Sequence, residues 1–343
     1  MRKFINVDGK FGRILIPFPH DPHFNPDVAK YDKMSFADRL AQIADDLTPN
    51  ERSTFEGFLS ITSGGTMENS SFFELIRWWA LNNYDMTQFM ELCLTFKFRH
   101  GQSSFARKFF DEALSTKRLS YNFNSPIDSV TETGNHVRVV AKDDRQFQAK
   151  RVICTVPLNV LHRLTFNPPL LQAKREASVM GHANHVVKVH VEVDNKELRS
   201  FSGITYPHNK LTYAFGDGTT PSGNTHIVSF GSSLPGVHLQ PEENIKETIA
   251  AFEEFTPMNI KRVVAHNWHK DEFSEGAWEF LKPGMATNYL DVLRERQGNV
   301  IFASADWALG WRGFIDGGIE DGARAAKEVK DELAAERTDG PRL

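Results

Sequence analysis

Glycine, aromatic and acidic residues are concentrated in one stretch near the C-terminus, NVIFASADWALGWRGFIDGGIEDGARAAK (residues 299–327). Its pattern predicts a buried strand at Val300–Ala303, an acidic turn at Asp306, a glycine-rich loop holding Phe314, and a helix from about Asp316. A helix that follows such a loop directs free N–H groups and the positive end of its dipole at the loop. The stretch therefore predicts a site for an electron-rich ligand.

A lysine and two tryptophans are the other candidates for chemistry. Lys188 lies in NHVVKVHVEV, where valines alternate and should share one face, so the lysine faces the other side. By default such a lysine faces solvent. Trp268 and Trp278 lie in HNWHKDEFSEGAWEFLKPG, and both could simply belong to the core, since buried aromatic residues usually do.

Several blocks, in this order, resemble the FAD-dependent amine oxidases, the monoamine oxidase family. They span about residues 90–330 and are FKFRHGQSSFA, SPIDSV, RVICTVPLNVL with FNPPL, NHVVKVHVEV, HNWHKDEFSEGAWEFLKPG and GWRGFIDGG. Each block alone is weak, but their shared order is specific. The resemblance implies an oxidoreductase that uses FAD to oxidise a primary or secondary amine to an imine and then an aldehyde, with release of hydrogen peroxide.

The resemblance also implies roles for single residues. Lys188 matches the lysine that contacts, through water, the flavin nitrogen that receives hydride, and Trp278 and Phe314 match the two walls of an aromatic cage. These three are the expected catalytic residues. The expected cofactor-binding residues are Ile127 against adenine, Trp268 against the flavin, Asp306 on the ribityl chain, and Gly313, Phe314 and Ile315 at the start of the C-terminal helix.

The chain departs from the family in two ways. Ala277 stands where monoamine oxidases carry the cysteine bonded to the flavin, so we expect non-covalent FAD. The sequence also lacks the strand, GxGxxG turn and acidic residue that open the family's dinucleotide site. Without them the pyrophosphate loses a helix N-terminus. Activity then requires that this half be supplied by another chain, by a homodimer or by a longer gene product.

The distribution of elements predicts a mixed α/β and α+β fold, with a partial Rossmann-type FAD-binding domain interleaved with a substrate domain of helices and a mixed sheet. Helices should dominate to about residue 115. Among them, Thr48-Pro49-Asn50-Glu51 is a capping box that opens a helix through Leu59. HVRVVAKD and QFQAKRVICTVP should form a hairpin. We expect the substrate domain at 1–95 and 178–262, the FAD-binding domain at 96–177 and 263–335, and a tail at 336–343.

Two other functions stay open. A truncated, non-catalytic paralogue would keep these blocks. It would need a partner chain or bind FAD only poorly. An amino-acid oxidase or a desaturase would keep the flavin and change the chemistry. An amino-acid oxidase would need an arginine for the substrate carboxylate, and nothing in the sequence ties Arg77, Arg99 or Arg163 to the site.

Composition limits the remaining possibilities. A net charge of −4 argues against a nucleic-acid partner, and no apolar run reaches the roughly 18 residues of a membrane span. The His20–His23 pair has no further ligands at metal spacing, so we expect no metal. The chain has 2 cysteines, which favours a reducing, cytoplasmic location. Its last residues, Pro341-Arg342-Leu343, loosely resemble a peroxisomal signal.

Overall fold

The computed structural model describes residues 1–231, 234 and 236–338, and its N-terminal part is helical. Its helices are α1 (Arg2–Ile5), α2 (Val28–Asp32), α3 (Phe36–Gln42), η1 (Ala44–Asp46), α4 (Pro49–Ser63), α5 (Phe72–Leu81) and α6 (Met86–Leu94). The predicted capping box opens α4: the Thr48 hydroxyl accepts from the N–H of Glu51, and the Glu51 carboxylate accepts from the N–H of Thr48. The helix runs beyond Leu59 to Ser63, because Gly64 ends it with a φ of 65°.

A five-stranded antiparallel sheet carries the lysine strand. Its order is β10 (Ile260–His266), β6 (Lys188–Val193), β9 (Thr225–Gly231), β8 (Leu211–Thr219) and β7 (Ser202–Ile204). The predicted alternation of β6 is confirmed, since Val187, Val189, Val191 and Val193 all lie in one buried cluster with residues of α10 (Ile245–Glu253). The turn η2 (Lys196–Ser200) follows β6. Lys188 and His190 therefore share the opposite face.

A second sheet follows α7 (Gln102–Ser115) and has the order β3 (Gln146–Ala149), β2 (Val137–Ala141), β1 (Ile127–Glu132), β5 (Thr165–Asn167). The expected hairpin forms only in part. β2 pairs with β3, but the chain then leaves this sheet, and β4 (Val152–Cys154) pairs in parallel with β11 (Val300–Phe302). QFQAKRVICTVP is thus two strands in two sheets. The prediction of a single strand was wrong because hydrophobic alternation does not reveal a change of partner.

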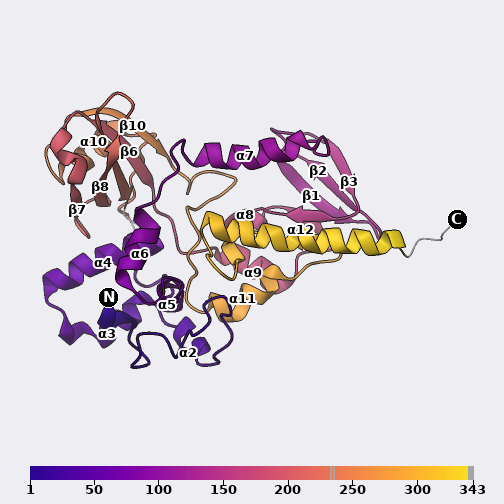
Figure 1. Ribbon diagram of the computed structural model, residues 1–343, viewed down its shortest axis with the longest axis horizontal. Helices are drawn as coiled ribbons and strands as arrows, with labels where there is room; N and C mark the ends of the chain where they lie inside the picture. The colour runs from indigo at the N-terminus through magenta and orange to yellow at the C-terminus, as the bar shows by residue number, and fades with distance from the viewer. Residues whose placement is uncertain (232–233, 235, 339–343) are drawn as a thin grey trace.

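The C-terminal stretch forms the predicted strand, turn and helix. β11 is fully buried, η3 (Ala305–Trp307) follows it, and α12 runs over Ile315–Thr338, one residue earlier than expected. α8 (Leu158–Leu161), α9 (Gln172–Met180) and α11 (Met285–Arg294) pack near this pair of strands. In Figure 1, α12 crosses the middle of the molecule, with α7 and β1–β3 on one side and α9 and α11 on the other.

One edge of β4 is open. The N–H of Val152 donates to Asn299, and the N–H of Ala303 donates to Cys154, so both outer residues of β4 turn their backbone toward β11. Backbone groups alternate between the two edges of a strand, so those of Ile153 face away from β11. Among the described residues no further strand pairs with β4, and the Ile153 side chain is 37% exposed. A parallel strand is usually buried on both sides, and this one is not.

The proline-rich segment near the N-terminus is a loop, as predicted. Pro17–Pro26 forms neither helix nor strand, and the short helices α1 and α2 flank it. Within the described part of the chain, no helix is both long enough and apolar enough to cross a membrane, and no group of three or more potential metal-binding side chains occurs. The peroxisome-like residues 341–343 lie outside the described residues.

Candidate functional site

Phe230 brings Lys188 and Trp278 to one place. β6 and β9 pair so that Lys188 lies directly opposite Phe230. The Lys188 Nζ atom lies 5.5 Å from the centroid of the Phe230 ring, and that ring packs perpendicular to Trp278, with centroids 5.7 Å apart. Desolvation by the surrounding protein lowers the pKa of Lys188, although the residue is exposed to solvent, as the default expectation for this strand had it. The site therefore holds a cation beside two perpendicular aromatic rings.

Gly313 brings the loop that carries Phe314 against the backbone of Glu279, the residue after Trp278. Its φ is +80°, and a Cβ built on it would lie 2.5 Å from the carbonyl oxygen of Glu279. The backbone carrying Phe314 therefore touches the backbone carrying Trp278. Phe314 itself packs edge-on against Trp78 at 4.8 Å and Trp311 at 5.1 Å. The Trp278 indole N–H donates to the Thr62 carbonyl over 3.2 Å, which fixes its ring to α4.

A fully buried charge cluster anchors this loop to α5. Arg312 donates to Glu74 over 2.8 Å and Arg77 donates to the same carboxylate over 3.1 Å. Burial would raise the pKa of Glu74, but the Arg312 and Arg77 guanidiniums outweigh it and lower the pKa to about 2. Burial and the Glu74 charge raise the pKa of the neighbouring Glu279, whose carboxyl oxygens have no hydrogen-bond partner. Arg312 and Arg77 thus stabilise the contact between this loop and α5, and neither guanidinium is free to bind a charged ligand.

The start of α12 offers a surface that fits the flavin end of FAD. Ile315 is 47% exposed and Ile319 is 44% exposed, one turn apart. On the same helix, a Cβ on Gly318 would have its nearest neighbour at 3.8 Å and one on Gly322 would meet nothing within 4 Å. A glycine in a helix has no side chain to cover the backbone, so a flat ligand can approach the backbone there. The first-turn N–H groups of a helix also have no acceptor inside it.

Asp306 lies at the turn between β11 and α12, as predicted. One carboxylate oxygen accepts from the N–H of Leu158 over 2.8 Å. Burial raises the pKa of the carboxyl, and the side chain remains partly accessible. A carboxyl group in this state can bond to a ligand hydroxyl group whether it is ionised or protonated.

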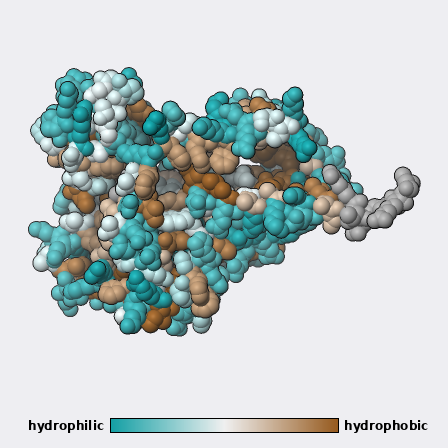
Figure 2. Space-filling model, viewed as in Figure 1, coloured by the Kyte–Doolittle hydropathy of each residue, from teal (hydrophilic) through white to brown (hydrophobic). Residues whose placement is uncertain are grey.

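Trp268 and Ile127 differ in their surroundings: Trp268 contacts the residue that pairs with Lys188 on β10, and Ile127 lies at the start of β1. Trp268 is 47% exposed and packs edge-on against His266 at 4.4 Å. Ile127 begins β1 and is partly buried against the main core. Figure 2 shows a hollow with hydrophobic lining between α12 and the part of the molecule that holds α7 and the β1–β3 sheet. Exposed apolar side chains on α7 and α12 include Phe109, Leu114, Ile315 and Ile319.

FAD therefore fits at one end only. The β11–α12 turn supplies apolar, acidic and N–H groups for the flavin and ribityl parts. For the pyrophosphate, a third parallel strand leading through a glycine-rich turn into a helix would be needed. The described residues contain no such unit, since β4 and β11 are the strands of that sheet.

Sequence reasoning missed Phe230 and Trp78. Phe230 lies in THIVSFG, where alternation placed a strand, but only the pairing register sets it opposite Lys188. Trp78 lies in the apolar helix α5, and nothing in that sequence indicates that its ring packs against Phe314. Of the three arginines considered for a substrate carboxylate, Arg163 pairs with Glu275 and Arg77 is buried against Glu74. Arg99 is exposed between α6 and α7.

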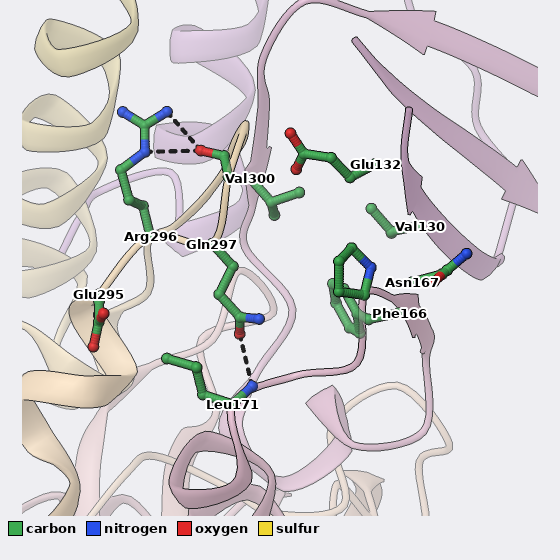
Figure 3. Close-up of a pocket in the computed structure, with 11 residues that line it drawn as sticks. Val130, Glu132, Phe166, Asn167, Leu171, Glu295, Arg296, Gln297 and Val300 are labelled. Carbon is green, nitrogen blue, oxygen red and sulfur yellow. Dashed lines mark hydrogen bonds between the residues drawn. The ribbon is translucent and has the colours of Figure 1, made fainter. Parts of the chain in front are cut away.

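A cavity of about 290 Å³ lies elsewhere, at the other end of β11 (Figure 3). Three of the polar residues that line it, Arg296, Gln297 and Glu132, already form hydrogen bonds with neighbouring backbone groups. Arg296 donates to the Gly298 carbonyl over 2.9 and 2.7 Å, Gln297 accepts from the N–H of Leu171 over 3.0 Å, and Glu132 accepts from the N–H of Asn299 over 2.9 Å. No set of free polar groups converges on its centre, so it is not the candidate site.

Comparisons with known proteins point to one family. The family model for flavin containing amine oxidoreductase matches residues 2–330. Pseudooxynicotine dehydrogenase of Pseudomonas sp is 26% identical over 318 residues, which cover 92% of this chain and 62% of the relative. Flavin-containing amine oxidase B of Canis lupus familiaris is 26% identical over 221 residues, 60% of this chain and 42% of the relative. The chain thus spans less than two thirds of either relative.

Solved structures share the fold. Cyclohexylamine oxidase from Brevibacterium oxydans superposes with a TM-score of 0.75 at 15% identity, covering 96% of this chain and 76% of that one. A variant of putrescine oxidase superposes with a TM-score of 0.76 at 19% identity, covering 94% and 75%. The predicted mixed α/β fold is confirmed.

Proposed function

The chain belongs to the family of flavin containing amine oxidoreductases, and we propose that it contributes to the FAD-dependent oxidation of a primary or secondary amine to an imine, which water converts to an aldehyde. The family implies FAD as the cofactor. Hydrogen peroxide is the expected second product where oxygen reoxidises the flavin. The partners are then an amine of apolar character and O2.

The observation that carries this proposal is the convergence of Lys188, Phe230 and Trp278. A cation beside aromatic rings fits a site that stabilises negative charge on one ligand and excludes water from another. Oxidation at the carbon beside a neutral amine nitrogen is the chemistry that bound FAD supplies.

The residues of this chain would then act as follows. Lys188 stabilises negative charge and holds water or oxygen at the reacting edge. The rings of Trp278 and Phe314 exclude water and orient the amine through their faces. Asp306 accepts from the ribityl chain, and Gly313, Phe314 and Ile315 hold the flavin at the start of α12. Trp268 and Ile127 contact the flavin and the adenine. Ala277 makes the attachment non-covalent.

We also propose that two interleaved domains divide this work. Residues 1–95 and 178–262 hold the substrate side, and residues 96–177 and 263–335 hold the cofactor side. In Figure 1 these segments occupy largely opposite sides of the molecule.

A second candidate is a member that binds FAD poorly and needs a completing partner chain or a homodimer. The open edge of β4 at Ile153 favours it, because an exposed apolar strand edge promotes association with another strand. An amino-acid oxidase gains no support, since Arg77 is bound to Glu74 and Arg163 to Glu275.

Anaerobic mixing of the FAD-supplemented protein with primary and secondary amines tests the first candidate. Bleaching of the flavin band, followed by peroxide release when air is admitted, would support amine oxidation. A bound flavin that no amine reduces would contradict it and leave the second candidate.

A further inference from the structure

Glu279 is a buried carboxyl group without a hydrogen bond. Its side chain is 1% exposed, and among the described residues neither of its carboxyl oxygens has a hydrogen-bond partner. The Nε atom of Arg312 lies 3.9 Å from one of these oxygens, which is beyond hydrogen-bond distance. A carboxylate without donors is costly to bury, whereas a neutral carboxyl group is much cheaper. The surroundings of Glu279 therefore favour its protonated form.

The neighbouring guanidinium groups are directed at another carboxylate. Arg312 donates to Glu74 through Nε over 3.3 Å and through Nη2 over 2.8 Å, and its Nη1 group donates to a backbone carbonyl of its own loop. Arg77 donates to Glu74 through Nε over 3.1 Å, and its Nη1 group donates to backbone carbonyls of the same loop. None of these bonds reaches Glu279, so neither arginine gives it the donors that a carboxylate needs.

Carboxyl groups also outnumber guanidinium groups here. The charged groups around Glu279 and Arg312 are Glu74 and Arg77 on α5, Arg312 before α12, Asp306 on η3 and Asp32 at the end of α2. Asp32 and Asp306 each accept from a backbone N–H, over 2.7 and 2.8 Å. Glu279 accepts none, and burial and the Glu74 charge raise its pKa well above the ordinary value. Of these carboxyls, Glu279 is the one that keeps its proton.

Glu279 lies where two loops meet. It directly follows Trp278, and its backbone carbonyl faces Gly313, which directly precedes Phe314. The segment that carries Trp278 and Glu279 is neither helix nor strand, and Trp278 is partly accessible. An ionised Glu279 side chain gains hydration if this segment moves away from the Gly313 loop. Ionisation should therefore favour a more open arrangement of the two loops.

We propose that Glu279 is a neutral carboxylic acid in the folded chain, and that its ionisation at alkaline pH separates the Trp278 segment from the loop of Phe314. Glu279 is then a positioning residue, since it acts through Trp278 and touches no ligand. The importance of this movement for catalysis rests on the proposed function, which assigns Trp278 and Phe314 to the amine site. The protonation state and the movement themselves do not depend on flavin.

The first experiment is 13C NMR of the flavin-free chain labelled at the glutamate carboxyl carbons. Glu279→Gln identifies the Glu279 signal by its loss. At about pH 6, where an ordinary glutamate is ionised, we expect this signal at the position of a protonated carboxyl group. A signal at the carboxylate position would overturn the proposal.

The second experiment compares Glu279→Gln with the parent chain by urea denaturation at several pH values. Above the ordinary glutamate pKa, the folded parent keeps a proton that the unfolded parent loses. Its folding equilibrium constant should therefore fall, relative to that of the variant, by up to about tenfold per pH unit. Glu112→Gln, at an exposed position of α7, is the matched control, and its ratio to the parent should not change over the same range. A constant ratio for Glu279→Gln would overturn the proposal.

Glu279→Leu guards against a variant that fails to fold. Leucine supplies neither charge nor hydrogen bonds, so it should replace a neutral, unpartnered carboxyl group without loss of folding. If both Glu279→Gln and Glu279→Leu fail to fold, Arg312 needs an ionised Glu279, and the proposal is wrong.

The movement is followed by 19F NMR of the chain labelled with 5-fluorotryptophan, with Trp278→Phe to identify the Trp278 signal. Between about pH 7 and 10 this signal should change in the parent and stay constant in Glu279→Gln. A parent signal that ignores pH, or an equal change in both chains, would overturn the proposed movement. A failure of amine oxidation would leave all these measurements unaffected, so the two failures are distinguishable.

Discussion

Gly313 lies so close to Glu279 that a Cβ atom at this glycine would be 2.5 Å from the Glu279 carbonyl oxygen. Trp278 directly precedes Glu279 and Phe314 directly follows Gly313, so the two predicted walls of the aromatic cage come from backbones in contact. The glycine between the walls therefore sets how closely they approach. The buried ion pair of Arg312 with Glu74 holds the same loop from the other side.

Gly313→Ala should destabilise the protein and separate the two walls. Alanine at a φ of +80° is strained, and its methyl group also meets the Glu279 carbonyl, so the free energy of unfolding should fall by about 1–3 kcal/mol. Urea denaturation measures it. Gly322→Ala is the control, since its Cβ meets nothing within 4 Å and alanine favours the helix by up to about 1 kcal/mol. Equal stability losses in both variants would contradict this role of Gly313.

The C-terminal motif could be predicted from sequence because its elements are local. A short apolar strand, a turn and a helix with glycines near its start follow one another without a change of partner, and the helix begins one residue from the expected position. The split of QFQAKRVICTVP between two sheets could not be predicted, because β4 pairs with β11 about 150 residues away. Phe230 stayed hidden for the same reason, since its position opposite Lys188 depends on the β6–β9 register.

Lys188→Met should slow the reaction of the reduced, flavin-bound protein with oxygen more than it weakens amine binding. The substitution removes the charge over Phe230 and keeps most of the side-chain volume. Stopped-flow reoxidation should slow by at least about tenfold, the effect of roughly 1.4 kcal/mol at the barrier. Lys142→Met, an exposed lysine paired with Glu272, should change neither step. An unchanged reoxidation rate would mean that Lys188 has another role.

Trp278→Ala should lower the turnover of small amines. The indole meets Phe230 edge-on and is fixed by its bond to Thr62, so its loss opens the site to water and frees the amine to reorient. We expect kcat/KM to fall about tenfold or more. Trp278→Phe keeps an aromatic face and should retain most of the activity. A normal rate in Trp278→Ala would show that the cage lies elsewhere.

Lys174→Met should stabilise the protein near neutral pH and flatten its pH dependence. Lys174 is fully buried, with its Nζ atom 3.4 Å from the centroid of the Phe302 ring, and burial lowers its pKa to about 7. Between about pH 7 and 10.5 the unfolded chain binds a proton that the folded chain does not. Stability from this group therefore rises with pH across that window, by up to about 1.4 kcal/mol per pH unit.

Urea denaturation at several pH values, from 6 to 10, measures this effect as the difference between Lys174→Met and the parent chain. The difference should be largest at the acidic end and shrink as pH rises. The exposed Lys142→Met should give a difference that does not vary with pH. A Lys174→Met difference that is constant over the same range would show that the lysine keeps its charge when buried.

The most direct test of the central claim is the absorbance spectrum of the purified chain after incubation with FAD and removal of the excess. The account predicts a retained flavin band that acid or denaturant releases completely, since Ala277 offers no covalent link. Ile315→Asp, which places a charge on the exposed apolar face of α12, should weaken that retention. A colourless protein, or retention that ignores Ile315→Asp, would contradict a flavin site at the start of α12.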